Sequence, residues 1–102
     1  MYNVHKIAEL LDFQAGAVVS RTIIDKPAGT VTLFAMDAGQ GLSEHSAPFD
    51  ALVQLLEGRL SVRIGGHDHE LAAGEMIVMP AEVPHALTAA SQSKFLLTMI
   101  KA

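Results

Sequence analysis

From Gly16 onward the chain is a succession of short apolar runs separated by turn residues, chiefly glycine, proline and serine. The turns recur about every 8–12 residues, which is typical of an all-β sandwich or barrel. No second helical pattern of useful length follows, which argues against a parallel α/β sheet. The predicted strands cover residues 18–24, 30–38, 42–45, 50–56, 60–64, 69–71, 76–79, 85–89 and 95–100.

The hydrophobic pattern also predicts which strand faces are buried. Apolar and polar residues alternate strictly over residues 60–64, so Leu60, Val62 and Ile64 are expected to face a core. Residues 51–56 and 76–79 are instead apolar on both faces, which predicts cover on both sides. In a single small barrel the second cover is most simply another subunit, so we expect a homodimer.

The N-terminal segment has a different pattern. Asn3 is placed to cap a short helix that runs to Leu11, with Val4, Ile7 and Ala8 at helical spacing on one face. The expected organisation is one domain over residues 1–102. Residues 1–16 would form the helix and lead-in, and residues 17–102 the barrel.

Composition narrows the function classes. The chain has 102 residues, of which 50% are hydrophobic and 18% charged, so an ordered single core is expected. The net charge is −4 and the seven basic residues are scattered, which argues against nucleic-acid binding. Disulfides and thiolate metal sites are excluded because there is no cysteine. No apolar run is long enough to span a membrane, and no signal-peptide pattern is present, so a cytoplasmic location is expected.

Five histidines are the candidates for chemistry: His5, His45, His67, His69 and His85. His67 and His69 follow a Gly-Gly hairpin turn and His5 has no partner nearby in sequence, so surface positions are expected for these three. His45 ends a glycine-bounded run, and His85 follows two closely spaced prolines that hold the chain extended. From the residues alone, His45 and His85 could be hydrogen-bonded core histidines, metal ligands or proton-transfer groups.

Two segments carry a family resemblance. Residues 41–58, GLSEHSAPFDALVQLLEG, resemble the first motif of the cupin family, and residues 74–85, GEMIVMPAEVPH, resemble the second. The resemblance extends from about residue 29 to the end of the chain. It implies an antiparallel double-sheet jelly-roll β-barrel preceded by the short helix.

The resemblance also implies a metal site, from which this chain departs. Cupins typically bind a divalent metal (Mn, Fe, Ni, Cu or Zn) through two histidines and a glutamate of the first motif and a histidine of the second. His45 and His85 occupy the first and last of these positions, but Ala47 and Ala51 occupy the other two. A glycine of the second motif is replaced by Glu82.

Two nearby side chains are candidate substitutes for the missing ligands. Asp50 precedes the expected glutamate position, but strand alternation would turn it to the opposite face unless the strand bulges. Gln54 lies farther along the same strand. Because two imidazoles alone hold a metal weakly, we expect the metal to be weakly bound or absent. Ala47, Ala51 and Val53 are then expected to line a wider, less polar pocket.

Three functional interpretations follow. The first is a dimeric binding module that holds a small molecule in this pocket. The second is a metal-dependent enzyme, of dioxygenase or isomerase type, that acts on a small oxygenated substrate through His45 and His85. The third is metal-free acid–base catalysis by one of the two imidazoles. Whether the protein is an enzyme stays open at this stage.

Overall fold

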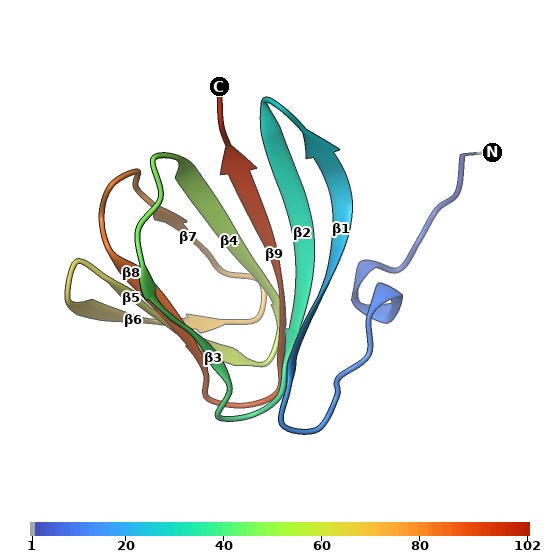
Figure 1. The fold of residues 1–102 in the computed structure, drawn as a ribbon. Coiled ribbons are helices and arrows are strands. Elements are labelled where there is room, and N and C mark those ends of the chain that lie inside the picture. Colours follow the sequence, from blue (N-terminus) through green and yellow to red (C-terminus); the bar gives the residue numbers. More distant parts are fainter. Residues whose placement is uncertain (1) are drawn as a thin grey trace.

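Nine β-strands form two antiparallel sheets in the computed structural model, which describes residues 2–102 (Figure 1). One sheet has the strand order β1-β2-β9-β4-β7 and the other β3-β8-β5-β6. The strands are β1 (Val18–Lys26), β2 (Gly29–Met36), β3 (Gly41–His45), β4 (Asp50–Glu57), β5 (Arg59–Ile64), β6 (His67–Ala72), β7 (Met76–Met79), β8 (His85–Ala89) and β9 (Ser93–Ile100).

The all-β prediction is confirmed, and each predicted run corresponds to one strand. Within residues 2–102 every strand pairing lies inside one of the two sheets, so the sheets face each other across side chains and no ladder joins them into a closed cylinder. No helix in this part of the chain is long and apolar enough to cross a membrane.

The core fills the space between the two sheets. Leu60 and Val62 on β5 are fully buried, as their alternation predicted, and Ile64 packs at the edge of the same cluster. On the opposite sheet Phe95 is fully buried and stacks on Phe34, with 5.0 Å between the ring centroids. Leu60, Val62 and Phe95 belong to one cluster, so side chains of both sheets meet in the core.

The predicted N-terminal helix is wrong. The segment contains only a 3-10 turn, η1 (Ile7–Leu10), without a side-chain cap. Val4 is fully exposed, and Ile7 and Ala8 of the expected stripe are only half-buried. A helix of this length is marginal in water without such packing.

Tertiary contacts hold the N-terminal segment against the sheet instead. Arg21 on β1 and Lys94 on β9 donate hydrogen bonds to the carbonyls of Leu10 (3.1 Å) and Ala8 (2.6 Å). By the strand register, the side chains of Arg21, Lys94 and the buried Leu33 lie on one face of the sheet. Leu33 pairs directly with Arg21 of β1 and lies diagonally across from Lys94 of β9. The segment therefore covers part of the outer face of the five-stranded sheet.

Candidate functional site

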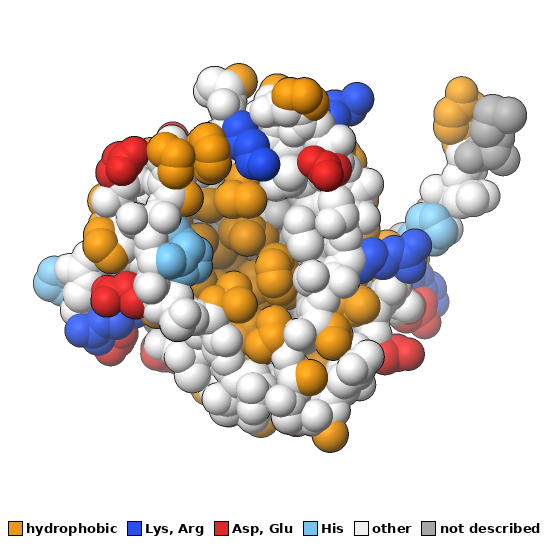
Figure 2. Space-filling view, viewed as in Figure 1, with side chains coloured by type: hydrophobic (Ala, Val, Ile, Leu, Met, Phe, Trp, Pro, Cys, Tyr) orange, Lys and Arg blue, Asp and Glu red, His pale blue; other side chains and the backbone are white. Residues whose placement is uncertain are grey.

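A pocket opens between the two sheets, with a cavity volume of about 40 Å³. Seven of its nine lining side chains are apolar, and the other two are His45 and His85. The walls come from β3 and β8 on one side and from β4, β7 and β9 on the other. Figure 2 shows this apolar hollow with a histidine at its rim.

The two histidines meet because of strand pairing. His45 is the last residue of β3 and His85 the first residue of β8, and they are direct partners in the ladder. Their rings are 4.4 Å apart in an edge-on arrangement, and their Nε2 atoms are 3.1 Å apart. His85 is buried, whereas His45 is exposed at the mouth of the pocket.

Backbone carbonyls decide which ring nitrogens carry hydrogen. The Nδ1 of His45 lies 2.8 Å from the carbonyl oxygen of Ser43, and the Nδ1 of His85 lies 3.2 Å from that of Val83. A carbonyl only accepts hydrogen bonds, so both Nδ1 atoms are inferred to be the donors. In the neutral rings both Nε2 atoms then carry lone pairs only 3.1 Å apart, which repel each other unless a proton, a hydrogen-bond donor or a cation bridges them. The pair is therefore ready to receive a hydrogen-bond donor or a cation.

The surroundings of His85 favour its neutral form. Burial lowers its pKa below the ordinary value for histidine, and the neighbouring His45 lowers it further, while the hydrogen bond to Val83 acts in the opposite direction. A neutral imidazole keeps its Nε2 lone pair available, which is what a ligand-accepting site needs.

The loop between β7 and β8 holds the site together. The N–H of Glu82 donates to the carbonyl of Ala47 (2.8 Å), and the N–H of Ala81 donates to the carboxylate of Asp50 (2.9 Å). Glu82 has a φ of 70°, a left-handed conformation that favours glycine. The turn of the second motif is thus kept although its glycine is replaced.

The remaining predicted site residues divide into two groups. Ala47 and Ala51 line the pocket with the two histidines. Asp50 and Gln54 are exposed on β4, where alternation turns them away from the buried Ala51, and Asp50 already holds the loop. Val53 is fully buried in the core and is not among the pocket-lining residues.

The other histidines lie away from the pocket. His67 and His69 are exposed at the start of β6, next to an ion pair between Arg63 and Asp68 (3.1 Å), and His5 is exposed in the N-terminal segment. These three occupy the surface positions that their sequence settings predict.

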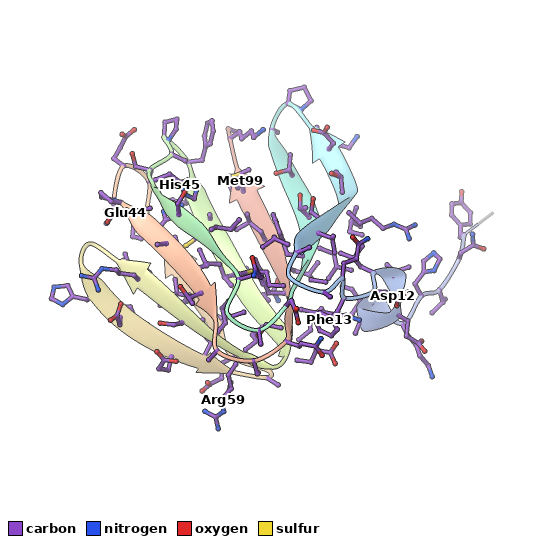
Figure 3. All side chains as sticks on the ribbon, turned by 60° about the horizontal axis from the view of Figure 1, so that its bottom comes forward. Asp12, Phe13, Glu44, His45, Arg59 and Met99 are labelled. Carbon is purple, nitrogen blue, oxygen red and sulfur yellow. The ribbon has the colours of Figure 1, made fainter. Side chains whose placement is uncertain are left out.

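Sequence reasoning missed the thioether groups of the pocket. Met79 on β7 and Met99 on β9 both line it (Figure 3 labels Met99 and His45 at the same end of the molecule). Only the strand register brings the methionines beside Ala51, and register between distant strands is not visible in the local pattern.

The divalent-metal site of the family resemblance does not fit these residues. Such sites need three or four nitrogen and carboxylate ligands, and only two imidazoles are present. Glu44 precedes His45 on β3, but its side chain is exposed (Figure 3). In the part of the chain that the structure describes, no group of three or more His, Cys, Asp or Glu side chains could hold a metal ion.

Comparisons with known proteins agree with this architecture. The family model described as "Cupin domain" matches residues 32–101. A conserved protein of unknown function from Streptococcus pyogenes is 32% identical, with a TM-score of 0.95 over 100% of this chain and 90% of its own. A cupin 2 conserved barrel domain protein from Leptotrichia buccalis is 35% identical, with a TM-score of 0.87 over 92% of this chain and 46% of its own.

A more distant likeness concerns the fold alone. Salicylate 1,2-dioxygenase from Pseudoaminobacter salicylatoxidans, in its G106A form, is 20% identical, with a TM-score of 0.77 over 84% of this chain and 27% of its own. No curated protein matches the chain.

Proposed function

Because the chain belongs to the cupin family, in which the end of the double sheet commonly forms a binding site, we propose that it is a small-molecule-binding protein. Its ligand would have an apolar body and one hydrogen-bond donor, such as an alcohol, an enol, a phenol or a carboxylic acid. The observation that supports this most directly is the convergence of two lone-pair nitrogens, from His45 and His85, in an otherwise apolar pocket.

The size of the pocket limits the ligand. A cavity of about 40 Å³ corresponds to roughly three water positions. The buried part of the ligand is therefore small, and any larger part extends past the exposed His45 into solvent. Inside, the donor group would bind the two Nε2 atoms while apolar atoms replace water against the aliphatic walls.

Specificity would come mainly from the nitrogen pair. Leaving a buried acceptor without a donor costs about 1–3 kcal/mol, so a ligand whose donor is blocked by methylation loses affinity. Apolar contacts alone would be nearly unchanged by that methylation. A loss of affinity on methylation therefore distinguishes binding through the two Nε2 atoms from binding through apolar contacts alone.

The metal-dependent enzyme is the less favoured alternative. The dioxygenase resembles this chain in fold only, and the pocket lacks the third and fourth ligands that a hard divalent metal needs.

The test uses pairs of probes that differ by one methyl group. Small phenols, enols and carboxylic acids, and their O-methyl counterparts, are screened by ligand-observed NMR against the metal-free protein. We expect the donors to bind and the methylated partners to bind at least about tenfold more weakly, which corresponds to the cost of one unpaired acceptor. The same weakening is expected for His45→Ala, an exposed position whose truncation costs little stability.

The matched control is His69→Ala, which removes an equally exposed strand histidine far from the pocket. Its binding should equal that of the parent protein. The proposal fails if methylated probes bind as well as the donors, or if His45→Ala leaves binding unchanged.

A homodimer is proposed as the working assembly. The outer face of the five-stranded sheet exposes Met76, Val78 and Ile100, each with about half of its residue surface in solvent (58%, 48% and 55%). β7 is apolar on both faces, and a second copy of the chain would cover the outer one. Light scattering should give twice the 10.8 kDa chain mass, and Val78→Lys should shift it towards the monomer. A monomeric parent protein would contradict this.

A further inference from the structure

The wall of the pocket that faces the two histidines carries two thioethers. Ala51 on β4 pairs with Met79 of β7 on one side and with Met99 of β9 on the other. Directly paired residues share a face, with Cβ atoms about 5 Å apart. Both methionines therefore flank Ala51 on the inner face, and the small alanine leaves the space between them open.

The sulfur and nitrogen groups line one small pocket. His45, His85, Met79 and Met99 all line the same cavity of about 40 Å³. Methionine has three rotatable side-chain bonds, so its sulfur can adjust to a ligand without moving the backbone. Met79 is only 2% exposed, so its side chain is shielded from bulk solvent.

The imidazoles already have the geometry of two neighbouring ligands. With metal–nitrogen bonds of about 2.0–2.1 Å, Nε2 atoms that are 3.1 Å apart subtend roughly 95–100° at a shared ion. That angle is near the tetrahedral one, so a shared ion would have two further positions for other ligands. The carbonyls of Ser43 and Val83 fix both rings through Nδ1, as the second layer of a metal site commonly does.

The chemistry of this donor set selects the metal. Thioethers are soft ligands that favour Cu(I), whereas manganese and magnesium favour carboxylates and water, and non-haem iron needs a carboxylate. The pocket has imidazole and thioether groups and no carboxylate. We propose that it is a binding site for one cuprous ion, held by His45, His85 and the sulfurs of Met79 and Met99.

This inference goes beyond the proposed function and does not depend on it. An organic ligand and Cu(I) would use the same two Nε2 atoms, so only one of them could be bound at a time. Copper binding is measured without any organic ligand, and organic binding without copper, which separates the failure of one proposal from the failure of the other.

The experiment is an anaerobic Cu(I) titration of the untagged protein in competition with a chromogenic Cu(I) chelator. We expect one equivalent of Cu(I) per chain, bound more tightly than Zn(II) or Mn(II) in parallel titrations. Met79→Leu and Met99→Leu keep the volume of the apolar wall, so the chain should still fold. Each change should weaken Cu(I) binding by about tenfold or more, a typical effect of disturbing a metal site.

Met76→Leu is the matched control, because Met76 lies on the same strand as Met79 with its side chain exposed on the outer face. Its Cu(I) affinity should equal that of the parent. X-ray absorption of the copper-loaded protein should show sulfur among the copper ligands, and this signal should disappear in the double variant Met79→Leu with Met99→Leu.

Three results would overturn the proposal. The first is a parent protein that binds Cu(I) no more tightly than Zn(II). The second is an unchanged affinity in the double variant, which would mean that the histidines bind copper without the thioethers. The third is a copper spectrum with nitrogen and oxygen ligands only.

Discussion

Filling the pocket should make the protein more stable and less able to bind. Ala51 lies on the pocket floor between the two methionines and is 5% exposed. Ala51→Val adds two methyl groups at this point, on a strand where a β-branched residue is favoured. We expect the added groups to occupy the space that a ligand needs, so that binding of both organic probes and Cu(I) is lost.

The expected gain in stability follows from the size of the cavity. Empty space enclosed in a core costs about 24 cal/mol per Å³, so this pocket of about 40 Å³, which opens to solvent at His45, costs at most about 1 kcal/mol. Ala51→Val should therefore raise the free energy of unfolding by up to about 1 kcal/mol. Urea denaturation would show this as a rise of roughly 0.3–1 M in the midpoint, for slopes of about 1–3 kcal/mol per M.

Gln54→Val is the matched control for this variant. Gln54 lies on the same strand but is exposed on the opposite face, so its substitution should change stability by less than about 0.5 kcal/mol and leave binding intact. Two results would refute the reasoning about Ala51. Unchanged binding in Ala51→Val would show that the ligands bind elsewhere. A clear loss of stability would show that the space is already filled by packed side chains.

Three further outcomes are expected. His67→Ala with His69→Ala should change the free energy of unfolding in urea by less than about 0.5 kcal/mol and leave Cu(I) affinity unchanged. A loss of Cu(I) binding in this variant would show that His45 and His85 are not the copper ligands. Ala47→His with Ala51→Glu should rebuild a hard-metal site and raise Zn(II) or Mn(II) affinity by orders of magnitude in a calorimetric titration, whereas no gain in a folded variant would contradict the assigned positions. The pKa of Asp37 is lowered by hydrogen bonds from the N–H of Gly16, the side chain of Gln92 and the N–H of Ala38. The contribution of Asp37 to stability is therefore present above its ordinary pKa of 3.8 and is lost as the pH falls through the lower folded value. In Asp37→Asn, the thermal unfolding midpoint should depend less on pH over this acidic range. An unchanged pH dependence would refute this.

The strands could be predicted from sequence because their signals are local. Alternation over residues 60–64 and the short apolar run at residues 76–79 each specify a strand without reference to the rest of the chain. The N-terminal segment shows where this fails. Its apolar spacing is helical, but the stripe is only half-buried against the sheet, and hydrogen bonds from Arg21 and Lys94 hold an irregular backbone instead.

The site was predictable only in part, for the same physical reason. The motif spacing brings His45 and His85 into consideration, and the structure pairs them across β3 and β8. Asp50 and Gln54 lie on the face that alternation predicts, away from the pocket. Met79 and Met99 become neighbours of Ala51 only through the register of three strands, which long-range pairing determines and a local pattern does not reveal.

The position of β9 has a consequence for how the chain folds during synthesis. β9 follows all the other strands in sequence, yet it lies in the middle of its sheet, between β2 and β4 (Figure 1). Until it leaves the ribosome, the β1-β2 hairpin and the β4-β7 pair share no ladder, and the pocket lacks the wall that carries Leu97 and Met99. Such non-local pairing is slow, with folding times of milliseconds to seconds for comparable all-β domains. During that interval the unpaired edges of β2 and β4 are exposed and can pair with other chains.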